Sequence, residues 1–425
     1  MQWDKIKSFS LALMTLVMTP LFAADFEITR FGAKEGGVVL NTAAIQAAID
    51  AAARDGGRVV VPAGVFVSGT LYMKSGVELH LEKGAVLKAS GNLADYNQDQ
   101  VYPENHGSVS EKWSNQHFII AYSLKGISIT GPGTIDGSSE EFFSKEIPPP
   151  RPRATGWIYG MRRGRLRPGQ MVAVVKCSDV FVGGGVTFKS SPCWTLFLYG
   201  CENVKVSGYN VRNGRSDANT DGIDIDCCRN VLVEDADIVT GDDSVAIRAN
   251  GRHFHDDVQK HVCENITVRN SKFHCEVMGV RVGVGQGIIR NVRIENCRAE
   301  HASIGVSFET VYGTPDGKGV DIENVVVDGL VTEDVYANWN LSVGGDMLTT
   351  GVRGIVFRNC TFAAVMERVY KRLDPLAPYE EPKEENCTFR EYTGESFRFH
   401  AEEKRKAAEA ASSKTQLNTA NKTGK

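Results

Sequence analysis

Three aspartates in two short glycine-containing motifs are the side chains of this 425-residue chain best suited to chemistry. Asp221 lies in an Asn-Thr-Asp-Gly motif, and Asp242 and Asp243 belong to a Gly-Asp-Asp motif about 20 residues later. Crowded carboxylates raise the pKa of at least one member, so the cluster offers a protonated acid beside an ionised base. Such a pair hydrolyses a glycosidic bond with inversion when its carboxyl groups stand about 6.5 to 9.5 Å apart and admit a water.

Two other interpretations of the motifs stay open from the residues alone. Aspartate beside glycine is common in tight turns, so the three side chains are also compatible with a purely structural role. Three clustered acids are, in addition, a candidate calcium site. A second weak metal pattern is formed by His253, His255 and Asp256, but no third ligand stands out and the same loop suits sugar binding. We expect no metal and no cofactor.

The elements that must position the aspartates are short strands in a repeat. Asparagine or aspartate followed by apolar, any, apolar recurs with steps of roughly 24 to 35 residues, at 179–182, 203–206, 230–233, 265–268, 291–294 and 324–327. Each strand is too short to bury a face alone, so neighbouring coils must stack. The pattern predicts an all-β solenoid in which Asp221 lies beside Asp242 and Asp243 on one exterior sheet face.

The two ends of the chain have different expected structures. Asn41 is expected to cap a helix that carries Ile45, Ile49 and Ala52 on one face and covers the open end of the solenoid. Lys5 precedes an apolar run that ends in small residues, which predicts a cleaved secretory signal and a periplasmic or extracellular protein without a membrane span. The expected units are a signal peptide over 1–23, a parallel β-helix catalytic domain over 24–395, and a charged helix with a disordered tail over 396–425.

Ten cysteines in an exported chain would ordinarily indicate disulfides, but their placement favours free thiols. Cys297, Cys360 and Cys387 each follow an asparagine in matching local contexts. Equivalent positions of stacked coils would place such cysteines in ladders, where they act as small buried apolar side chains. We therefore expect mostly free buried thiols and at most one or two bridges.

The order of motifs along the chain resembles glycoside hydrolase family 28, the polygalacturonase type. Phe-Gly-Ala at 31–33, Gly-Thr-Ile-Asp-Gly at 133–137 and Ser-Pro-Cys-Trp at 191–194 precede the aspartate motifs, and the resemblance runs from about residue 28 to about 370. It implies a single-stranded right-handed parallel β-helix of the pectin-lyase-like kind, and an inverting hydrolase of pectin-type or other acidic polysaccharides or oligosaccharides. It further implies that Asp242 donates the proton and that Asp221 and Asp243 position and deprotonate the water.

Two later motifs depart from that family. The family's Gly-His-Gly corresponds to Val-Met-Gly at 277–279, and its Arg-Ile-Lys, which grips the substrate carboxylate, corresponds to Ser-Phe-Glu at 307–309. Arg248 and Arg281 are candidate replacement cations, with solvated strand-end arginines as the alternative. The substrate-binding residues expected on this basis are Asn219, Asp224, Arg248, Met278, Gly279, Arg281, Ser307 and Glu309, with Asp226 a weaker candidate.

An arginine-rich insertion between residues 148 and 170 also carries Trp157 and Tyr159. Aromatic faces stack on sugar rings and guanidinium groups pair with acidic groups, so it is either a wall over a uronate-containing glycan or a solvated loop. The net charge of −4 and the export signal exclude nucleic acid as a partner. Two further functions stay open: a polysaccharide lyase on the same fold, and a non-catalytic glycan-binding β-helix.

Overall fold

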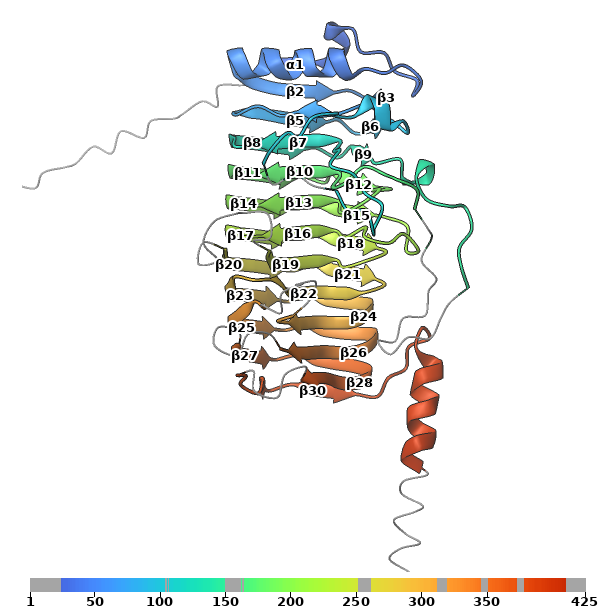
Figure 1. Cartoon of the computed structure of the whole chain (residues 1–425), viewed down its shortest axis with the longest axis vertical. Coiled ribbons are helices and arrows are strands. Elements are labelled where there is room, and N and C mark those ends of the chain that lie inside the picture. The colour runs from blue at the N-terminus through green and yellow to red at the C-terminus, as the bar shows by residue number, and fades with distance from the viewer. Residues whose placement is uncertain are drawn as a thin grey trace, which may run out of the picture.

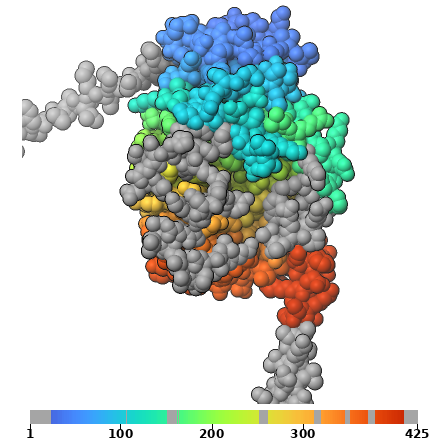
Figure 2. All heavy atoms as spheres, viewed as in Figure 1, coloured from blue at the N-terminus to red at the C-terminus, as the bar shows by residue number. Residues whose placement is uncertain are grey.

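The computed structural model describes residues 24–103, 105, 107–149, 162, 164–250, 261–311, 319–344, 351–372 and 378–409. The chain winds into a column of stacked coils, with the N-terminal helix across one end and a C-terminal helix beside the other (Figure 1). Figure 2 shows the blue N-terminal region and the red C-terminal region at opposite ends of the molecule. Every pairing between the named strands is parallel, so the predicted parallel β-helix is confirmed. In the first pair, for example, Phe26 on β1 lies opposite Val59 on β2.

One twelve-stranded sheet runs along one side of the column, and it carries the repeat found in the sequence. Its strands, in order, are β1 (Ala24–Glu27), β2 (Gly57–Val61), β5 (Val77–Leu81), β8 (Lys125–Thr130), β11 (Ser178–Gly183), β14 (Glu202–Ser207), β17 (Arg229–Glu234), β20 (Val262–Arg269), β23 (Ile288–Glu295), β25 (Asp321–Asp328), β27 (Val352–Arg358) and β29 (Lys383–Glu385).

The remaining strands form two rows that merge into one sheet at the long strand β24 (Arg298–Glu309), which pairs with both rows. The row that carries the aspartates contains β4 (Leu71–Tyr72), β7 (Ile119–Tyr122), β10 (Val172–Val175), β13 (Leu196–Tyr199), β16 (Ile223–Asp226), β19 (Val245–Ala249) and β22 (Met278–Gly285). The other row contains β3 (Gly64–Ser68), β6 (Ala85–Ala89), β9 (Thr134–Asp136), β12 (Thr187–Lys189), β15 (Asn210–Arg212), β18 (Asp237–Thr240) and β21 (Lys272–Cys275). Beyond the junction lie β26 (Val331–Val343), β28 (Thr361–Arg372) and β30 (Thr388–Arg390).

The apolar positions of the repeat form the core of the column. Because side chains alternate between the faces of a strand, the first apolar residue of each repeat points inward and meets its equivalent in the next coil. These residues are all buried and pair in register as a continuous row: Val180, Val204, Val231, Ile266, Val292, Val325 and Ile355.

The asparagine of each repeat lies within its strand, where it bends the backbone and joins the coils. Asn203, Asn230, Asn265, Asn291 and Asn324 all have φ between 53° and 59°, the left-handed region that asparagine tolerates better than most residues. The side-chain amide of each later member donates to the side-chain oxygen of the one before it, over 2.8 to 3.1 Å. We call this row the asparagine ladder. It explains why the residue type recurs at this position.

The N-terminal helix α1 (Thr42–Asp55) buries Ile45, Ile49 and Ala52, as the sequence pattern predicts. The prediction that Asn41 caps it was wrong in its contact. Asn41 stands at the N-cap position, but its side chain makes no capping hydrogen bond and instead accepts from the Lys34 backbone amide at 2.7 Å. The remaining short helices are η1 (Ile28–Phe31), η2 (Leu93–Asp95) and η3 (Ser139–Glu141).

The C-terminal helix over residues 398–409 is attached through a partly buried polar cluster. Asp334 on β26 accepts hydrogen bonds from the Tyr392 hydroxyl at 2.5 Å and the Ser396 amide at 3.3 Å. The Ser396 hydroxyl lies 3.1 Å from the His301 ring, and the buried ring of Phe397 stacks on the same histidine. These contacts fix the start of the helix on the side of the column.

All ten cysteines are free, which confirms the expectation of unbridged thiols. Cys201, Cys228 and Cys263 stack in successive coils, and each thiol donates to a backbone carbonyl of the preceding coil over 3.2 to 3.6 Å. Residues 1–23 and 410–425, where the signal peptide and the tail are expected, lie outside the described residues. None of the described helices is both long and apolar enough to cross a membrane.

Candidate active site

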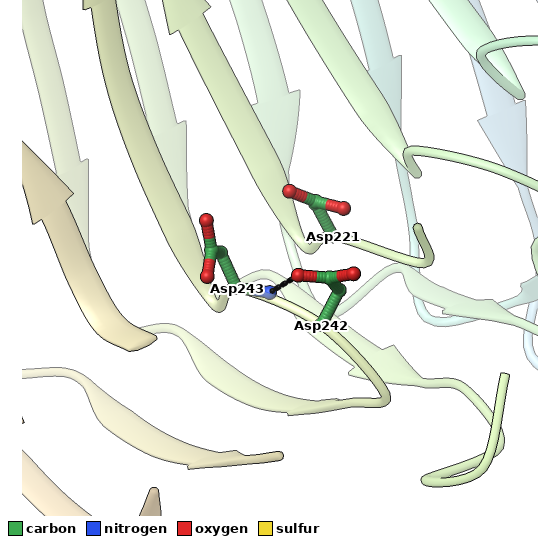
Figure 3. A group of neighbouring side chains, drawn as sticks. All are labelled: Asp221, Asp242 and Asp243. Carbon is green, nitrogen blue, oxygen red and sulfur yellow. Dashed lines mark hydrogen bonds between the residues drawn. The ribbon is translucent and has the colours of Figure 1, made fainter. Parts of the chain in front are cut away.

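The two aspartate motifs lie at the starts of neighbouring strands, where the sequence places them. Asp221 precedes β16 and Asp242 and Asp243 precede β19, and these strands pair in register from Ile223 and Val245. One carboxylate oxygen of each aspartate lies within 4.8 Å of the others (Figure 3). This closest approach is tighter than the separation of about 6.5 to 9.5 Å between the acid and base of inverting enzymes, so the spacing by itself does not favour inversion.

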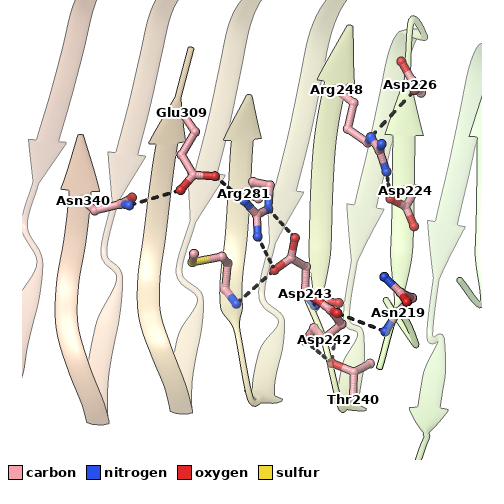
Figure 4. A network of polar contacts seen from close by, with 11 residues as sticks. Asn219, Asp224, Asp226, Thr240, Asp242, Asp243, Arg248, Arg281, Glu309 and Asn340 are labelled. Carbon is pink, nitrogen blue, oxygen red and sulfur yellow. Dashed lines mark hydrogen bonds and ion pairs between the residues drawn. The ribbon is translucent and has the colours of Figure 1, made fainter. Parts of the chain in front are cut away.

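Asp242 is held by two backbone amides. The amide of Asn219 donates to one carboxyl oxygen at 3.0 Å, and the amide of Asp243 donates to the other at 3.1 Å (Figures 3 and 4). Burial, followed by the charge of Asp243, raises the pKa of Asp242 to about 7, although the Arg281 charge and both amides oppose the shift. Asp242 therefore keeps its proton in mildly acidic solution, as a general acid must.

Asp221 is the second carboxyl group that favours the protonated form. It is buried, and one of its oxygens has no hydrogen-bond partner among the described residues. Burial and the charges of Asp224, Asp242 and Asp243 raise the pKa of Asp221 well above its ordinary value. The cluster thus holds at least one proton close to a charged carboxylate, which is the arrangement that acid–base catalysis uses.

Asp243 belongs to a chain of polar contacts that runs away from the cluster across the sheet (Figure 4). The Arg281 guanidinium donates through two nitrogens to Asp243, and through its third nitrogen to Glu309. Glu309 in turn accepts from the Asn340 amide at 3.4 Å, and the Met278 backbone amide donates to Asp243 at 3.1 Å. Arg281 is buried, so its alternative interpretation as a solvated strand-end arginine was wrong.

The other expected residues on this side have packing roles. Ser307 is fully buried in register between Arg281 and Asn340, and its hydroxyl has no partner among the described residues. The Met278 side chain packs in a small apolar cluster with Ile304. Gly279 lies so close to the neighbouring coil that a Cβ there would stand 2.6 Å from a backbone oxygen.

Arg248 forms a second buried ion-pair group on the opposite side of the aspartates. Its guanidinium donates to Asp224 at 2.9 Å and lies 3.8 Å from Asp226 (Figure 4). The same guanidinium lies 4.3 Å from the centre of the Trp194 ring. Burial raises the pKa of Asp224 to about 7 against the opposing effect of Arg248. The interpretation of Arg248 as solvated was therefore also wrong.

Two arginines of the arginine-rich insertion hold the segment that contacts the aspartate cluster. The sequence pattern does not predict this role. Arg167 is buried and donates to the side-chain oxygen of Asn219 at 3.0 Å. Arg162 donates through two nitrogens to Asp217, at 2.5 and 2.7 Å. Asp217 lies two residues before Asn219 in the same loop. These two arginines fix the segment that presents Asn219 to Asp242. The expected residues Arg151, Arg153, Trp157, Tyr159, Arg163, His253, His255 and Asp256 lie outside the described residues.

The cluster opens into a cleft of about 700 Å³. On the N-terminal side of the aspartates the cleft wall is aromatic, with Trp113 and Trp194 5.8 Å apart and Trp194 and Phe197 5.5 Å apart. Tyr102 and Tyr199 complete this wall. The strand repeat gives no signal for this wall, because Tyr102 and Trp113 lie outside the repeat.

The aspartates are also, among the described residues, a group with oxygens close enough to hold a metal ion. The donor set suits a cation poorly. Arg281 already balances the charge of Asp243, and a metal would have to displace protons from Asp221 and Asp242, whose pKa values are raised. The arrangement favours proton transfer over metal binding.

Comparison with known proteins gives one consistent family. Residues 53–370 match the family described as glycosyl hydrolases family 28. The chain is 25% identical over 328 residues to a probable polygalacturonase of Vitis vinifera, matching 75% of this chain and 62% of that protein. It is 24% identical to an endo-polygalacturonase of Pectobacterium carotovorum subsp. carotovorum, over 92% of this chain and 89% of that one. The chain thus spans less than two thirds of the Vitis relative.

The fold is likewise shared with a solved enzyme structure. The exopolygalacturonase of Thermotoga maritima superposes with a TM-score of 0.58 at 19% identity, covering 85% of this chain and 92% of that one. At this identity the likeness shows the fold alone. It agrees with the parallel β-helix described above.

Proposed function

The chain belongs to glycosyl hydrolases family 28, and from that premise we propose that it is an inverting glycoside hydrolase of pectin-type polysaccharides or oligosaccharides. The single observation that carries the proposal is the meeting of Asp221, Asp242 and Asp243 in one cleft, with Asp242 held by two amides. The named relatives are polygalacturonases, which supports a pectin substrate.

In the proposed reaction Asp242 donates its proton to the oxygen of the leaving sugar. Asp243, whose charge Arg281 balances, and Asp221 hold a water against the opposite face of the ring, and the ionised Asp243 accepts its proton. Asn219 positions Asp242 through its backbone amide, and Arg167 holds Asn219 in place. Inversion rests on the family resemblance rather than on the carboxyl spacing.

The proposed setting is outside the cytoplasm. The N-terminal 23 residues have the composition of a signal peptide that is removed on export. A secreted or periplasmic enzyme meets plant polysaccharide directly, so export and a pectin substrate support each other.

The ion pairs weigh against an arginine base, one form of the lyase alternative. A lyase needs an unprotonated basic side chain, often an arginine, lysine or tyrosine, close to the sugar. Arg248 and Arg281, the two arginines that line the described part of the cleft, are both paired with carboxylates, which stabilise their protonated forms.

The test compares wild type with Asp242→Asn on homogalacturonan and rhamnogalacturonan fragments, with release of reducing ends as the measurement. We expect a loss of at least about 10²-fold, because general acid catalysis contributes that much. Asp235→Asn, a change at an exposed turn with φ 53°, is the matched control and should retain activity. Full activity of Asp242→Asn, or an unsaturated product absorbing in the ultraviolet, contradicts the proposal. The anomeric configuration of the first product, followed by NMR, tests inversion.

A further inference from the structure

We infer that the sugar units held in the described part of the cleft are uncharged, either neutral sugars or uronates whose carboxyl group is esterified. This inference rests on the proposed function, since it names the substrate class of the same cleft. It is carried by the charges that line the cleft, by their partners, and by the aromatic wall.

The described cleft lining is strongly acidic. Five carboxylic acids face two arginines, and no other cationic side chain is found among the lining residues that the structure describes: the acids are Glu111, Asp221, Asp226, Asp242 and Asp243, and the arginines are Arg248 and Arg281. With Asp221 and Asp242 protonated, the two arginines face the remaining acids without a surplus of positive charge. Binding a polyanion needs such a surplus of cationic donors, and the described lining does not supply one.

Both arginines already serve carboxylates of the protein. All three nitrogens of the Arg281 guanidinium donate to protein carboxylates, namely Asp243 and Glu309. Arg248 pairs with Asp224 and approaches Asp226. A substrate carboxylate placed against either guanidinium would have to compete with acids that are built into the fold, of which Asp224, Asp226 and Asp243 are buried.

The aromatic wall suits an uncharged sugar. Trp113, Trp194, Phe197 and Tyr199 form a series in which neighbouring rings stand 5.5 to 5.8 Å apart. Aromatic faces pack against the C–H face of a sugar ring without requiring any charge. Trp113, Phe197 and Tyr199 are buried and support Trp194, whose partly exposed ring provides apolar surface to a neutral or esterified unit beside the acidic cluster.

Glu309 is the residue whose charge can be removed without touching the three aspartates. Arg281 pairs with both Glu309 and Asp243. Removing the Glu309 charge therefore leaves the Arg281 guanidinium with one carboxylate partner and a surplus of positive charge. The removal of one charge beside a partly exposed cleft changes the affinity for a substrate carboxylate by at least about tenfold. Glu309 thus acts as a specificity determinant that keeps the cleft unsuited to acidic units.

The first experiment measures binding without turnover. Three trisaccharides of one backbone are titrated calorimetrically into Asp242→Asn: trigalacturonate, its methyl ester, and the carboxyl-reduced form. We expect both uncharged forms to bind at least about tenfold more tightly than the acid, and the ratio between them distinguishes an esterified uronate from a neutral sugar. Equal or tighter binding of the acid, or no binding of either uncharged form, overturns the inference.

The second experiment adds Glu309→Gln to the same protein. The preference for the uncharged forms should fall by about tenfold, because Arg281 then loses one of its two carboxylate partners and can donate to a substrate carboxylate instead. Glu323→Gln is the matched control, since Glu323 forms an exposed pair with Arg353 on the other sheet and should leave the ratio unchanged. An unchanged ratio in Glu309→Gln overturns the role of Glu309.

The proposed function and this inference fail in different ways. Reducing ends released by wild type with a preference for the acid would overturn the inference and leave the hydrolase assignment standing. The expected binding preference without any release of reducing ends would support the inference and contradict the hydrolase.

Discussion

Replacing Asp242 with asparagine should change the pH dependence of folding stability as well as activity. The pKa of this carboxyl is raised from 3.8 to about 7, mainly by burial and by the Asp243 charge. The folded protein therefore keeps a proton that the unfolded chain releases. Because the folded-state pKa is the higher one, wild-type stability falls as the pH rises from about 4 to about 7.

The size of the effect follows from the same two pKa values. At about 1.4 kcal/mol per pH unit, the difference corresponds to about 4 kcal/mol lost between pH 4 and pH 8. Asparagine cannot ionise, so the variant should lack this loss. It keeps only one oxygen for the amides of Asn219 and Asp243, which costs about 1 kcal/mol or more at every pH.

The assay is urea denaturation of wild type and Asp242→Asn at pH 4 and pH 8. The cost of the lost hydrogen bond is the same at both pH values and cancels in the comparison. From pH 4 to pH 8 the free energy of unfolding of the variant should therefore rise by about 4 kcal/mol relative to that of wild type. Asp235→Asn, at an exposed position, should follow wild type at both pH values. Parallel pH curves for wild type and Asp242→Asn would refute the reasoning that Asp242 is protonated in the folded enzyme.

Three further changes test the elements around the site. Arg248→Met leaves two buried aspartates without their counter-ion and should cost about 3 to 5 kcal/mol in urea denaturation. Asn265→Ala removes two ladder hydrogen bonds and strains a backbone at φ 59°, and should lower stability by about 2 kcal/mol, with Asn265→Gly less affected because glycine adopts that conformation freely. Burial lowers the pKa of His301, but hydrogen bonds to Asp334 and Glu276 outweigh burial, so the pKa is raised overall. The protonated ring therefore stabilises the attachment of the C-terminal segment below about pH 6.5, and this stabilisation is lost as the pH rises through the raised pKa. Proteolysis of that segment should accelerate over this pH range in wild type and not in His301→Asn.

Each of these has an outcome that contradicts it. Unchanged stability in Arg248→Met would mean that protonation of the buried aspartates compensates fully for the missing counter-ion, which contradicts the expected cost. Equal melting temperatures for the alanine and glycine variants of Asn265 would show that backbone strain contributes nothing. Proteolysis independent of pH in wild type would remove His301 from the attachment of the helix.

The sequence predicted the parts of the molecule that repeat. The inward row from Val180 to Ile355 and the ladder from Asn203 to Asn324 recur because stacked coils impose the same environment on each equivalent position. The placement of the aspartates followed from the same periodicity, since Asp221 and Asp242 begin adjacent coils.

The parts that do not repeat were beyond the sequence. Arg167 reaches Asn219 across 52 residues of chain, and Arg281 reaches Glu309 across 28, so neither pairing has a local signal. The aromatic wall recruits Trp113 from a connection outside the repeat. The predicted capping bond of Asn41 is absent because its side-chain oxygen accepts from the Lys34 backbone amide and not from an amide of the helix.

The asparagine ladder also determines how such a protein can change in length. Since each rung joins any coil to the next by the same bond, a duplicated coil adds one rung and extends the column by about 4.8 Å without altering the existing rungs. Insertion of a single residue within a strand would instead exchange its inner and outer faces. Growth by whole coils is therefore the permitted route by which descendants of this chain acquire longer clefts.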